Sequence, residues 1–177
     1  MKKIASLALA ICMACPLSAQ TIANMKDLTA GQKAAATSVK LTGTLSTRGN
    51  SDIRQLRDLC WQLKHVDLST ANCPTLPANA FHSRHRLESV VLPANLKSIG
   101  TQAFFACDAL KQLTLPATLE EVGAAAFSGC SSLESITIEG TPRLGGFAFR
   151  GCNNLRSIKL LSKVPPQCDA TAFEGVD

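Results

Sequence analysis

The sequence has few aromatic residues and little charge. It has one Trp and no Tyr among 177 residues, and Asp, Glu, Lys and Arg together make up 18%. Proteins that bind nucleic acid combine extended basic surfaces with aromatic side chains for base stacking, so this composition predicts no nucleic-acid partner. Hydrophobic residues make up 46%. That content is enough to bury a core and excludes a disordered chain.

The short motifs that carry catalysis are also absent. The sequence has no glycine-rich phosphate loop, no nucleophile elbow and no HExxH motif. A metal site could be built from His82, His85 and Cys73, but only one pair of these ligands is local and structural zinc uses four. We therefore predict that the protein is not an enzyme and needs no cofactor or metal.

One short segment concentrates basic residues: His82-Ser83-Arg84-His85-Arg86. It could meet an anionic partner, but a solvated loop is favoured because nucleic-acid-binding surfaces are more extended. The rest of the chain has mixed charge. Without Lys2 and Lys3, 16 basic residues remain against 13 acidic ones.

Long apolar runs are absent except at the start of the chain. Two lysines, an apolar run from Ile4 to Cys15 and small residues up to Ala19 have the layout of a secretory signal. The run is too short for a permanent transmembrane helix. We predict a signal peptide over residues 1–19, cleavage after Ala19, and a secreted or cell-surface protein whose residues 20–38 form a flexible leader.

Lipid anchoring at Cys12 or Cys15 is the alternative to plain cleavage. Bacterial lipoprotein signals usually resemble Leu-small-small-Cys, and the residues before both cysteines break that pattern. Plain cleavage is therefore favoured.

Two sets of residues recur with one period. The phenylalanine of an Ala-Phe pair recurs at spacings of 23, 23, 22 and 24 residues, and the leucine that opens each unit recurs at 24, 23, 23 and 22. Each unit begins Leu-x-x-(Val/Leu/Ile)-x-(Leu/Ile), and this alternation predicts a short strand with one face inward. A glycine before Ala-Phe permits a tight turn. The two series are Phe81, Phe104, Phe127, Phe149 and Phe173, and Leu63, Leu87, Leu110, Leu133 and Leu155.

A single unit cannot cover its own apolar edge, so neighbouring units are expected to stack. Stacked strands pair at about 4.8 Å and bring Phe over Phe and Leu over Leu. The sequence thus predicts an α/β repeat protein, a solenoid with a short-strand parallel sheet on one face and turns or short helices on the other. The residues predicted to face inward include Val66, Leu68, Leu87, Val90, Leu92, Leu96, Ile99, Leu113, Leu115, Leu119, Val122, Ile136, Ile138, Leu144, Ile158 and Leu160.

The pattern LPxxLxxIGxxAFxxCxxLxxI resembles the BspA-type leucine-rich repeat of secreted and surface bacterial proteins. The resemblance covers five units over residues 63–177 and implies a leucine-rich-repeat solenoid. Residues 39–62 also look like the family's entry module, a strand followed by a helix that caps the first end. Ser51 or Asp52 is expected to cap this helix, and its inward face should hold Ile53, Leu56, Leu59 and Cys60.

The last unit departs from the family pattern. It stops at Asp177, whereas relatives typically continue with a further strand and a closing segment. Its apolar residues, among them Leu155 and Phe173, would then present an uncovered face, which repeat proteins avoid. We expect either a truncated gene product or an edge that pairs with another chain, which would allow self-association through the uncapped C-terminal rung.

Three cysteines form a column of their own. Cys107, Cys130 and Cys152 each follow a repeat phenylalanine by three residues. Export favours disulfides, but side chains on adjacent rungs stand about 4.8 Å apart, beyond the usual Cβ separation in a disulfide. Buried free thiols are favoured for this column, and the pairing of Cys60, Cys73 and Cys168 cannot be read from the sequence.

The outward side chains of the strands suggest the function. Most are small, polar or β-branched, and an extended sheet of this kind suits a long or repetitive partner. We predict a non-enzymatic binding module that contacts an extracellular protein or glycan, and the family resemblance implies adhesion. The alternative is a structural spacer or a truncated remnant without a ligand. The predicted contact residues are His65, Asp67, Ser89, Val91, Gln112, Thr114, Ser135, Thr137, Ser157 and Lys159.

Overall fold

The computed structural model describes residues 20–22, 25, 28–46 and 51–176. The predicted signal peptide, its cleavage point and the two cysteines of the lipoprotein alternative lie outside these residues. Within the described part of the chain, no helix is long and apolar enough to span a membrane.

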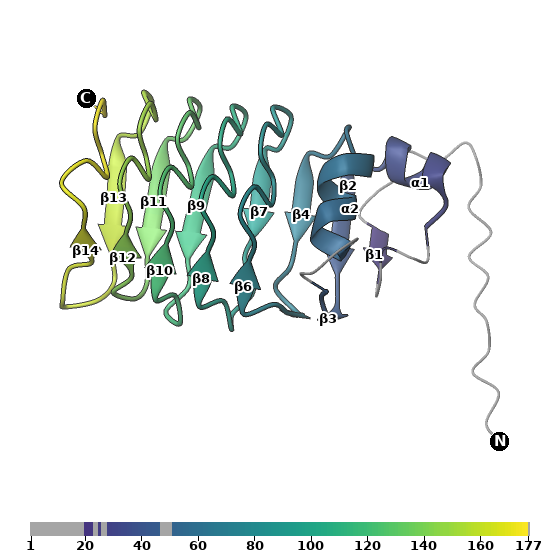
Figure 1. The fold of residues 1–177 in the computed structure, drawn as a ribbon, viewed down its shortest axis with the longest axis horizontal. Helices are drawn as coiled ribbons and strands as arrows, with labels where there is room; N and C mark the ends of the chain where they lie inside the picture. Colours follow the sequence, from purple (N-terminus) through teal and green to yellow (C-terminus); the bar gives the residue numbers. More distant parts are fainter. Residues whose placement is uncertain (1–19, 23–24, 26–27, 47–50, 177) are drawn as a thin grey trace, which may run out of the picture.

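The chain winds into a solenoid of about six coils, and the strands of successive coils lie side by side (Figure 1). Every strand pairing is parallel, as the stacking of repeats predicts. The strands of the first face run in the order β1-β2-β4-β7 and then β9-β11-β13. They are β1 (Gln20–Ile22), β2 (Ser38–Leu41), β4 (His65–Asp67), β7 (Ser89–Val91), β9 (Gln112–Leu115), β11 (Ser135–Ile138) and β13 (Ser157–Leu160).

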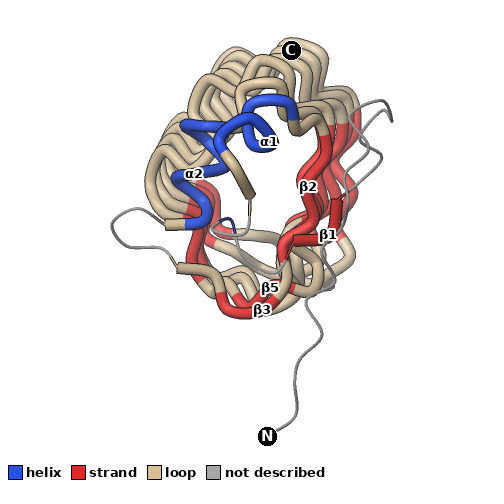
Figure 2. The backbone as a smooth tube through the Cα atoms, turned by 90° about the vertical axis from the view of Figure 1, so that its right-hand side faces the viewer, coloured by secondary structure: helices blue, strands red, loops and turns tan. Residues whose placement is uncertain are grey.

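Strands of two residues each form a separate pair at the bottom of the coil in Figure 2 and a second face of the solenoid. The repeat pattern does not predict them, because a two-residue strand has a single inward side chain and shows no alternation. One pair joins β3 (Gly43–Thr44) to β5 (Ala71–Asn72). The others pair in the order β6 (Thr75–Leu76), β8 (Ser98–Ile99), β10 (Glu121–Val122), β12 (Arg143–Leu144) and β14 (Gln167–Cys168).

The repeat phenylalanines form one continuous stack through the interior. Neighbouring ring centroids lie 5.0–5.3 Å apart and the ring planes are within 17° of parallel. The prediction of a phenylalanine column is confirmed. Of the sixteen residues predicted to face inward, fourteen are buried, and Ile158 and Leu160 are 45% and 44% exposed. The prediction of burial is wrong for these two residues. They continue the inward column of the preceding strands, but no further coil of described residues covers them.

The glycine that precedes three of the five Ala-Phe pairs has a different role from the one expected. Gly123 does not adopt a left-handed conformation, so the turn itself does not require glycine. A Cβ atom at Gly123 would lie 2.6 Å from the backbone nitrogen of Thr101 in the preceding coil, and Gly100 and Gly145 are equally crowded. Glycine is therefore required by the close approach of neighbouring coils.

The leader predicted over residues 20–38 contains a short helix and a strand in the structure. Helix α1 (Ala30–Ala35) begins with a capping box in which Thr29 and Gln32 bond reciprocally. Buried Lys33 donates from Nζ to Gln55 Oε1 at 2.8 Å. Together with β1, this segment adds a further layer beyond the first coil (Figure 1).

Helix α2 (Asp52–Leu59) has the predicted cap but a different position. Ser51 Oγ accepts from the Arg54 backbone nitrogen at 3.1 Å. The helix forms the third side of the first coil, between β3 and β4, and β1 and α1 lie outside it (Figure 1). Ile53, Leu56 and Cys60 are fully buried as predicted, whereas Leu59 is 43% exposed. Leu59 is the last residue of the helix, and its exposure is a correction to the predicted inward face.

Candidate binding surface

The predicted contact residues lie in two rows on the first face of the solenoid, here called the sheet face. His65 is opposite Ser89 and Asp67 is opposite Val91 on β4 and β7. All ten are exposed or half-buried. On β9, β11 and β13, one row holds Gln112, Ser135 and Ser157, and the other holds Thr114, Thr137 and Lys159.

The centre of the sheet face is uncharged, and its charged residues lie toward the two ends. Asp67 pairs with Lys40 of β2 at 2.8 Å, and Lys159 lies on β13. Partial burial favours a higher pKa for Asp67, but hydrogen bonds from Lys40 and Ser69 outweigh it and hold that pKa below its usual value. Lys40 was not among the predicted contact residues, although the alternation over residues 38–41 could have placed it in this row.

A row of alternating charge runs beside the sheet face. Glu88 accepts from Lys64 at 2.8 Å, and the hydrogen bond from Lys64 lowers the Glu88 pKa. Backbone hydrogen bonds link the equivalent position in each coil to the next, so these charges follow one another along the solenoid. The members of the row are Lys64, Glu88, Lys111, Glu134 and Arg156.

The residues of the possible metal site contact different neighbours. The His82 ring stacks on Phe105 at 5.0 Å, and His85 Nδ1 lies 2.7 Å from Asp108 Oδ2. Cys73 is buried and its thiol donates to the Thr75 carbonyl. In the described ranges no three His, Cys, Asp or Glu side chains gather in a way that could hold a metal ion.

The cysteine column lies in the interior of the solenoid. Cys107, Cys130 and Cys152 are fully buried, and each thiol donates to a backbone carbonyl of the preceding coil at 3.2–3.3 Å. Burial raises the pKa of Cys107 and Cys152 to about 12. All six described cysteines are free thiols, and Cys168 is the exposed one among them. The column is therefore suited to packing and not to nucleophilic chemistry.

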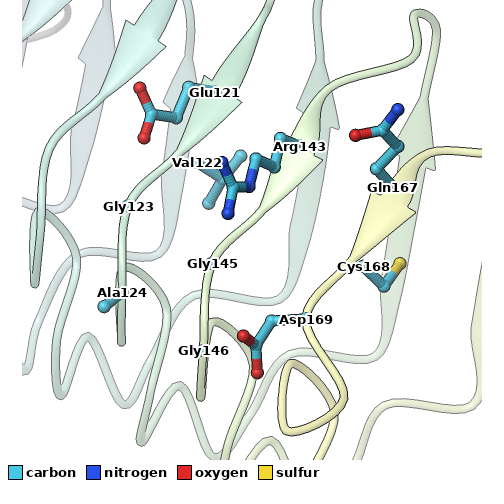
Figure 3. Close-up of a pocket in the computed structure, with 10 residues that line it drawn as sticks. All are labelled: Glu121, Val122, Gly123, Ala124, Arg143, Gly145, Gly146, Gln167, Cys168 and Asp169. Carbon is cyan, nitrogen blue, oxygen red and sulfur yellow. The ribbon is translucent and has the colours of Figure 1, made fainter.

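The second face has a polar hollow of about 490 Å³ near the C-terminal coils (Figure 3). Glu121, Arg143 and Gln167 come from three successive coils and line it at equivalent positions. The Glu121 carboxylate points away from the Arg143 guanidinium (Figure 3). The backbone of Gly123 and Gly145 forms part of the lining, so the hollow lies where the glycines have no side chains. Its described residues form no assembled catalytic pair.

Residues 74–176 match the BspA type leucine rich repeat region, in six copies. The chain belongs to the BspA-type leucine-rich-repeat family. The match covers more than half of the chain and confirms the resemblance seen in its repeats. The repeat pattern in the sequence predicts five units over residues 63–177, whereas the family match begins at residue 74 and contains six copies.

Solved structures of bacterial leucine-rich-repeat proteins resemble this family member. The leucine-rich-repeat protein TpLRR of T. pallidum is 26% identical, with a TM-score of 0.60 over 76% of this chain and 61% of that one. A leucine-rich-repeat protein of Bacteroides ovatus is 28% identical, with a TM-score of 0.49 over 68% and 34%. The pneumococcal vaccine antigen PcpA is 22% identical, with a TM-score of 0.51 over 78% and 31%. The chain thus spans about three fifths or less of these proteins. No curated protein matches it.

Proposed function

We propose that this protein is an exported, non-enzymatic binding module that recognises an extracellular protein or glycan through its sheet face. The observation that carries the proposal is the register of the outward side chains, which puts ten residues from five strands on one exposed surface. A partner with a repeating structure can contact equivalent positions on successive coils, so that many weak contacts add up.

The uncharged centre of the sheet face is the part to test. Bulky substitutions, Thr114→Phe and Thr137→Phe, point into solvent from strand positions that accept aromatic residues, so the fold should persist. The matched control is Thr101→Phe, at an exposed turn position on another side of the coil. Binding to immobilised extracellular-matrix proteins and polysaccharides should be lost in the first two variants and kept in the control.

The same experiment separates binding from the spacer alternative. A spacer or remnant without a ligand would bind no member of the panel in any variant. Equal loss of binding in the control would place the contact surface elsewhere. Circular dichroism of each variant establishes that the fold is retained.

Export and signal-peptide cleavage are tested at the N-terminus of the chain. N-terminal analysis of the exported protein should find Gln20 as the first residue. An acylated cysteine at position 12 or 15 would establish the lipid anchor instead. An uncleaved chain retained inside the cell would contradict export.

Self-association is proposed through β13 and its exposed apolar side chains. Ile158, Leu160, Leu161 and Val164 are 44–63% exposed, and β13 has a free edge in the described structure. Unpaired strand edges with apolar side chains pair readily with other chains. Light scattering should show a mass that rises with concentration, and a monomer at high concentration would contradict the proposal.

A further inference from the structure

Four arginines from two separate segments meet on the side of the solenoid formed by α2 and the first repeat turn. Arg54 and Arg57 come from α2, and Arg84 and Arg86 come from the basic segment at residues 82–86. The Arg84 guanidinium donates to the Arg57 carbonyl at 2.7 Å, and Arg57 donates to the Asn79 carbonyl at 3.0 Å. Folding therefore extends the short basic segment into a larger surface.

Acidic residues neutralise only part of this charge. Asp58 accepts from Arg57 through both carboxylate oxygens, at 2.7 and 3.2 Å, and lies 3.6 Å from Arg54. The hydrogen bond from Arg57 lowers the Asp58 pKa, so Asp58 stays ionised. Asp52, also on α2, is 5% exposed and its oxygens accept from the backbone of Met25 and Ser46. The accessible carboxylates beside the four arginines, among the described residues, are therefore Asp58 and Asp108, which pairs with His85.

Two of the arginines bond to uncharged groups. Arg86 donates to the neutral side chain of Gln62. Arg84 Nε is buried and, among the described residues, has no hydrogen-bond partner. The fold therefore holds both guanidinium groups in position, and Arg86 is the exposed one of the two.

The protein's single tryptophan lies at the end of the same surface. Trp61 is 57% exposed, an unusual position for its largest aromatic side chain, and Leu59 beside it is 43% exposed. Leu63, Leu87 and Leu110 each bond to the carbonyl three residues earlier, so Trp61 occupies the same place in its coil as His85 and Asp108 in the next two coils. The exposed indole is thus followed along the solenoid by two polar side chains.

We propose that this surface, the arginine ridge formed by Arg54, Arg57, Arg84, Arg86, Trp61 and Gln62, binds an anionic polysaccharide. The indole face packs against the C–H face of a sugar ring, and the guanidinium groups pair with carboxylate or sulfate groups of the polymer, whose geometry they match. Arg54 and Arg57 are about 4.5 Å apart along the helix axis, and Arg84 and Arg86 come from the next coil, so the charges are spread over two coils, as a polymer requires.

The hydroxyl groups of a polysaccharide suit the carboxylates beside the ridge. Asp58 and Asp108 repel the anionic groups of either polymer, polysaccharide or nucleic acid, but they can accept hydrogen bonds from the several hydroxyls that each sugar ring of a polysaccharide presents. Single-stranded nucleic acids also bind to several aromatic platforms in succession, and Trp61 is the sole tryptophan. The arginine ridge lies on the turn side of the coil, so this inference does not depend on the sheet face.

The test uses the full chain and two polymers, heparin for sulfate groups and polygalacturonate for carboxylates. Because Trp61 is the sole tryptophan, its fluorescence reports directly on the ridge. We expect a saturable change in emission with at least one polymer, and an affinity that falls as salt is raised. Arg54→Gln with Arg86→Gln should weaken binding about tenfold or more, since each charged contact is worth about that factor.

Two controls make the result specific. The double variant Arg143→Gln with Lys163→Gln removes the same charge from exposed residues of the later coils and should leave the affinity unchanged. Trp61→Ala, measured by retention on immobilised heparin or polygalacturonate, should elute at lower salt than the natural chain. Thermal unfolding of every variant checks that the fold is intact.

Several outcomes would overturn the inference. Equal loss of affinity in the two double variants would mean that only net charge matters. No fluorescence response to either polymer would remove the role of Trp61. Tighter binding to a single-stranded oligonucleotide than to either polymer would assign the ridge to nucleic acid. Loss of binding in Thr114→Phe, with the ridge variants unaffected, would favour the sheet face alone.

Discussion

The thiol of Cys130 lies 3.2 Å from the carbonyl oxygen of Phe104, one coil earlier. Cys107 and Cys152 make the same contact with Phe81 and Phe127. Each cysteine therefore fills a small interior space and also joins two coils by a hydrogen bond. This arrangement explains why a buried thiol recurs at this position of the repeat without any sign of catalytic use.

The cysteine column should resist modification in the folded protein. Burial denies a reagent access and raises the pKa of Cys107 to about 12, so the reactive thiolate is scarce near neutral pH. After treatment with iodoacetamide at pH 8, mass spectrometry should find Cys168 modified and the three column cysteines unmodified. Denaturation should make all of them reactive. A disulfide between Cys107 and Cys130 in the non-reduced protein would contradict this prediction.

The same thiols should make the fold less stable at alkaline pH. Their pKa is raised from an ordinary 9.0 to about 12 in Cys107 and Cys152, so the stability they contribute is complete below pH 9 and is lost as pH rises toward 12. At pH 10 each thiol should cost about 1.4 kcal/mol of unfolding free energy relative to pH 8. Urea unfolding at the two pH values measures this loss. The variant Cys152→Ala should lose less between pH 8 and pH 10 than the natural chain, and an equal loss would contradict the assignment.

The phenylalanine stack should carry a large share of the stability. Phe127 is fully buried between Phe104 and Phe149, with ring centroids at 5.1 and 5.3 Å. Phe127→Ala should lower the free energy of unfolding by about 3–5 kcal/mol, because the cavity lies between coils that cannot collapse into it. Phe105→Ala, at a half-buried position next in the chain to Phe104, is the control and should cost much less. Similar losses in both variants would mean that the stack has no special role.

Much of the fold could be predicted because each position of the repeat occurs in several units of the sequence. Fourteen inward residues, the phenylalanine stack and the rows of the sheet face follow from a period of 22–24 residues combined with strand alternation. Ile158 and Leu160 fit the same pattern, yet burial depends on a neighbouring coil that the pattern does not contain.

The arginine ridge could not be predicted in this way, because it occurs once and joins two segments whose arginines are 27 residues or more apart. The contact between Arg84 and the Arg57 carbonyl depends on how α2 packs against the first repeat turn, and no periodicity records it. Helix α1 was also not predicted, although Thr29 and Gln32 have the spacing of a capping box. The prediction of a leader followed the composition of residues 20–38 and not this capping-box spacing.

The crowded glycines give a test of how closely the coils approach. An ideal Cβ at Gly123 would lie 2.6 Å from the Thr101 backbone nitrogen, a contact that only a shift of the backbone can relieve. Gly123→Ala should lower the melting temperature by several degrees or prevent folding. The same chemical change at Gly31 in α1, where a Cβ meets nothing within 4 Å, should be neutral or stabilising. A neutral result at Gly123 would mean that the coils are further apart than described.

At the position two residues after the repeat phenylalanine, a change from alanine to glycine should stabilise the protein. Ala106 has a φ of 54°, a left-handed conformation that costs about 1–2 kcal/mol for a residue with a Cβ, whereas Gly129 and Gly151 hold the equivalent positions at 76° and 71°. Ala106→Gly should stabilise the protein by up to about 1 kcal/mol, because relief of this strain exceeds the added flexibility of the unfolded chain. Gly151→Ala should have the reverse effect of similar size. Chemical denaturation of the two variants measures both changes, and a loss of stability in Ala106→Gly would show that the turn tolerates alanine without strain.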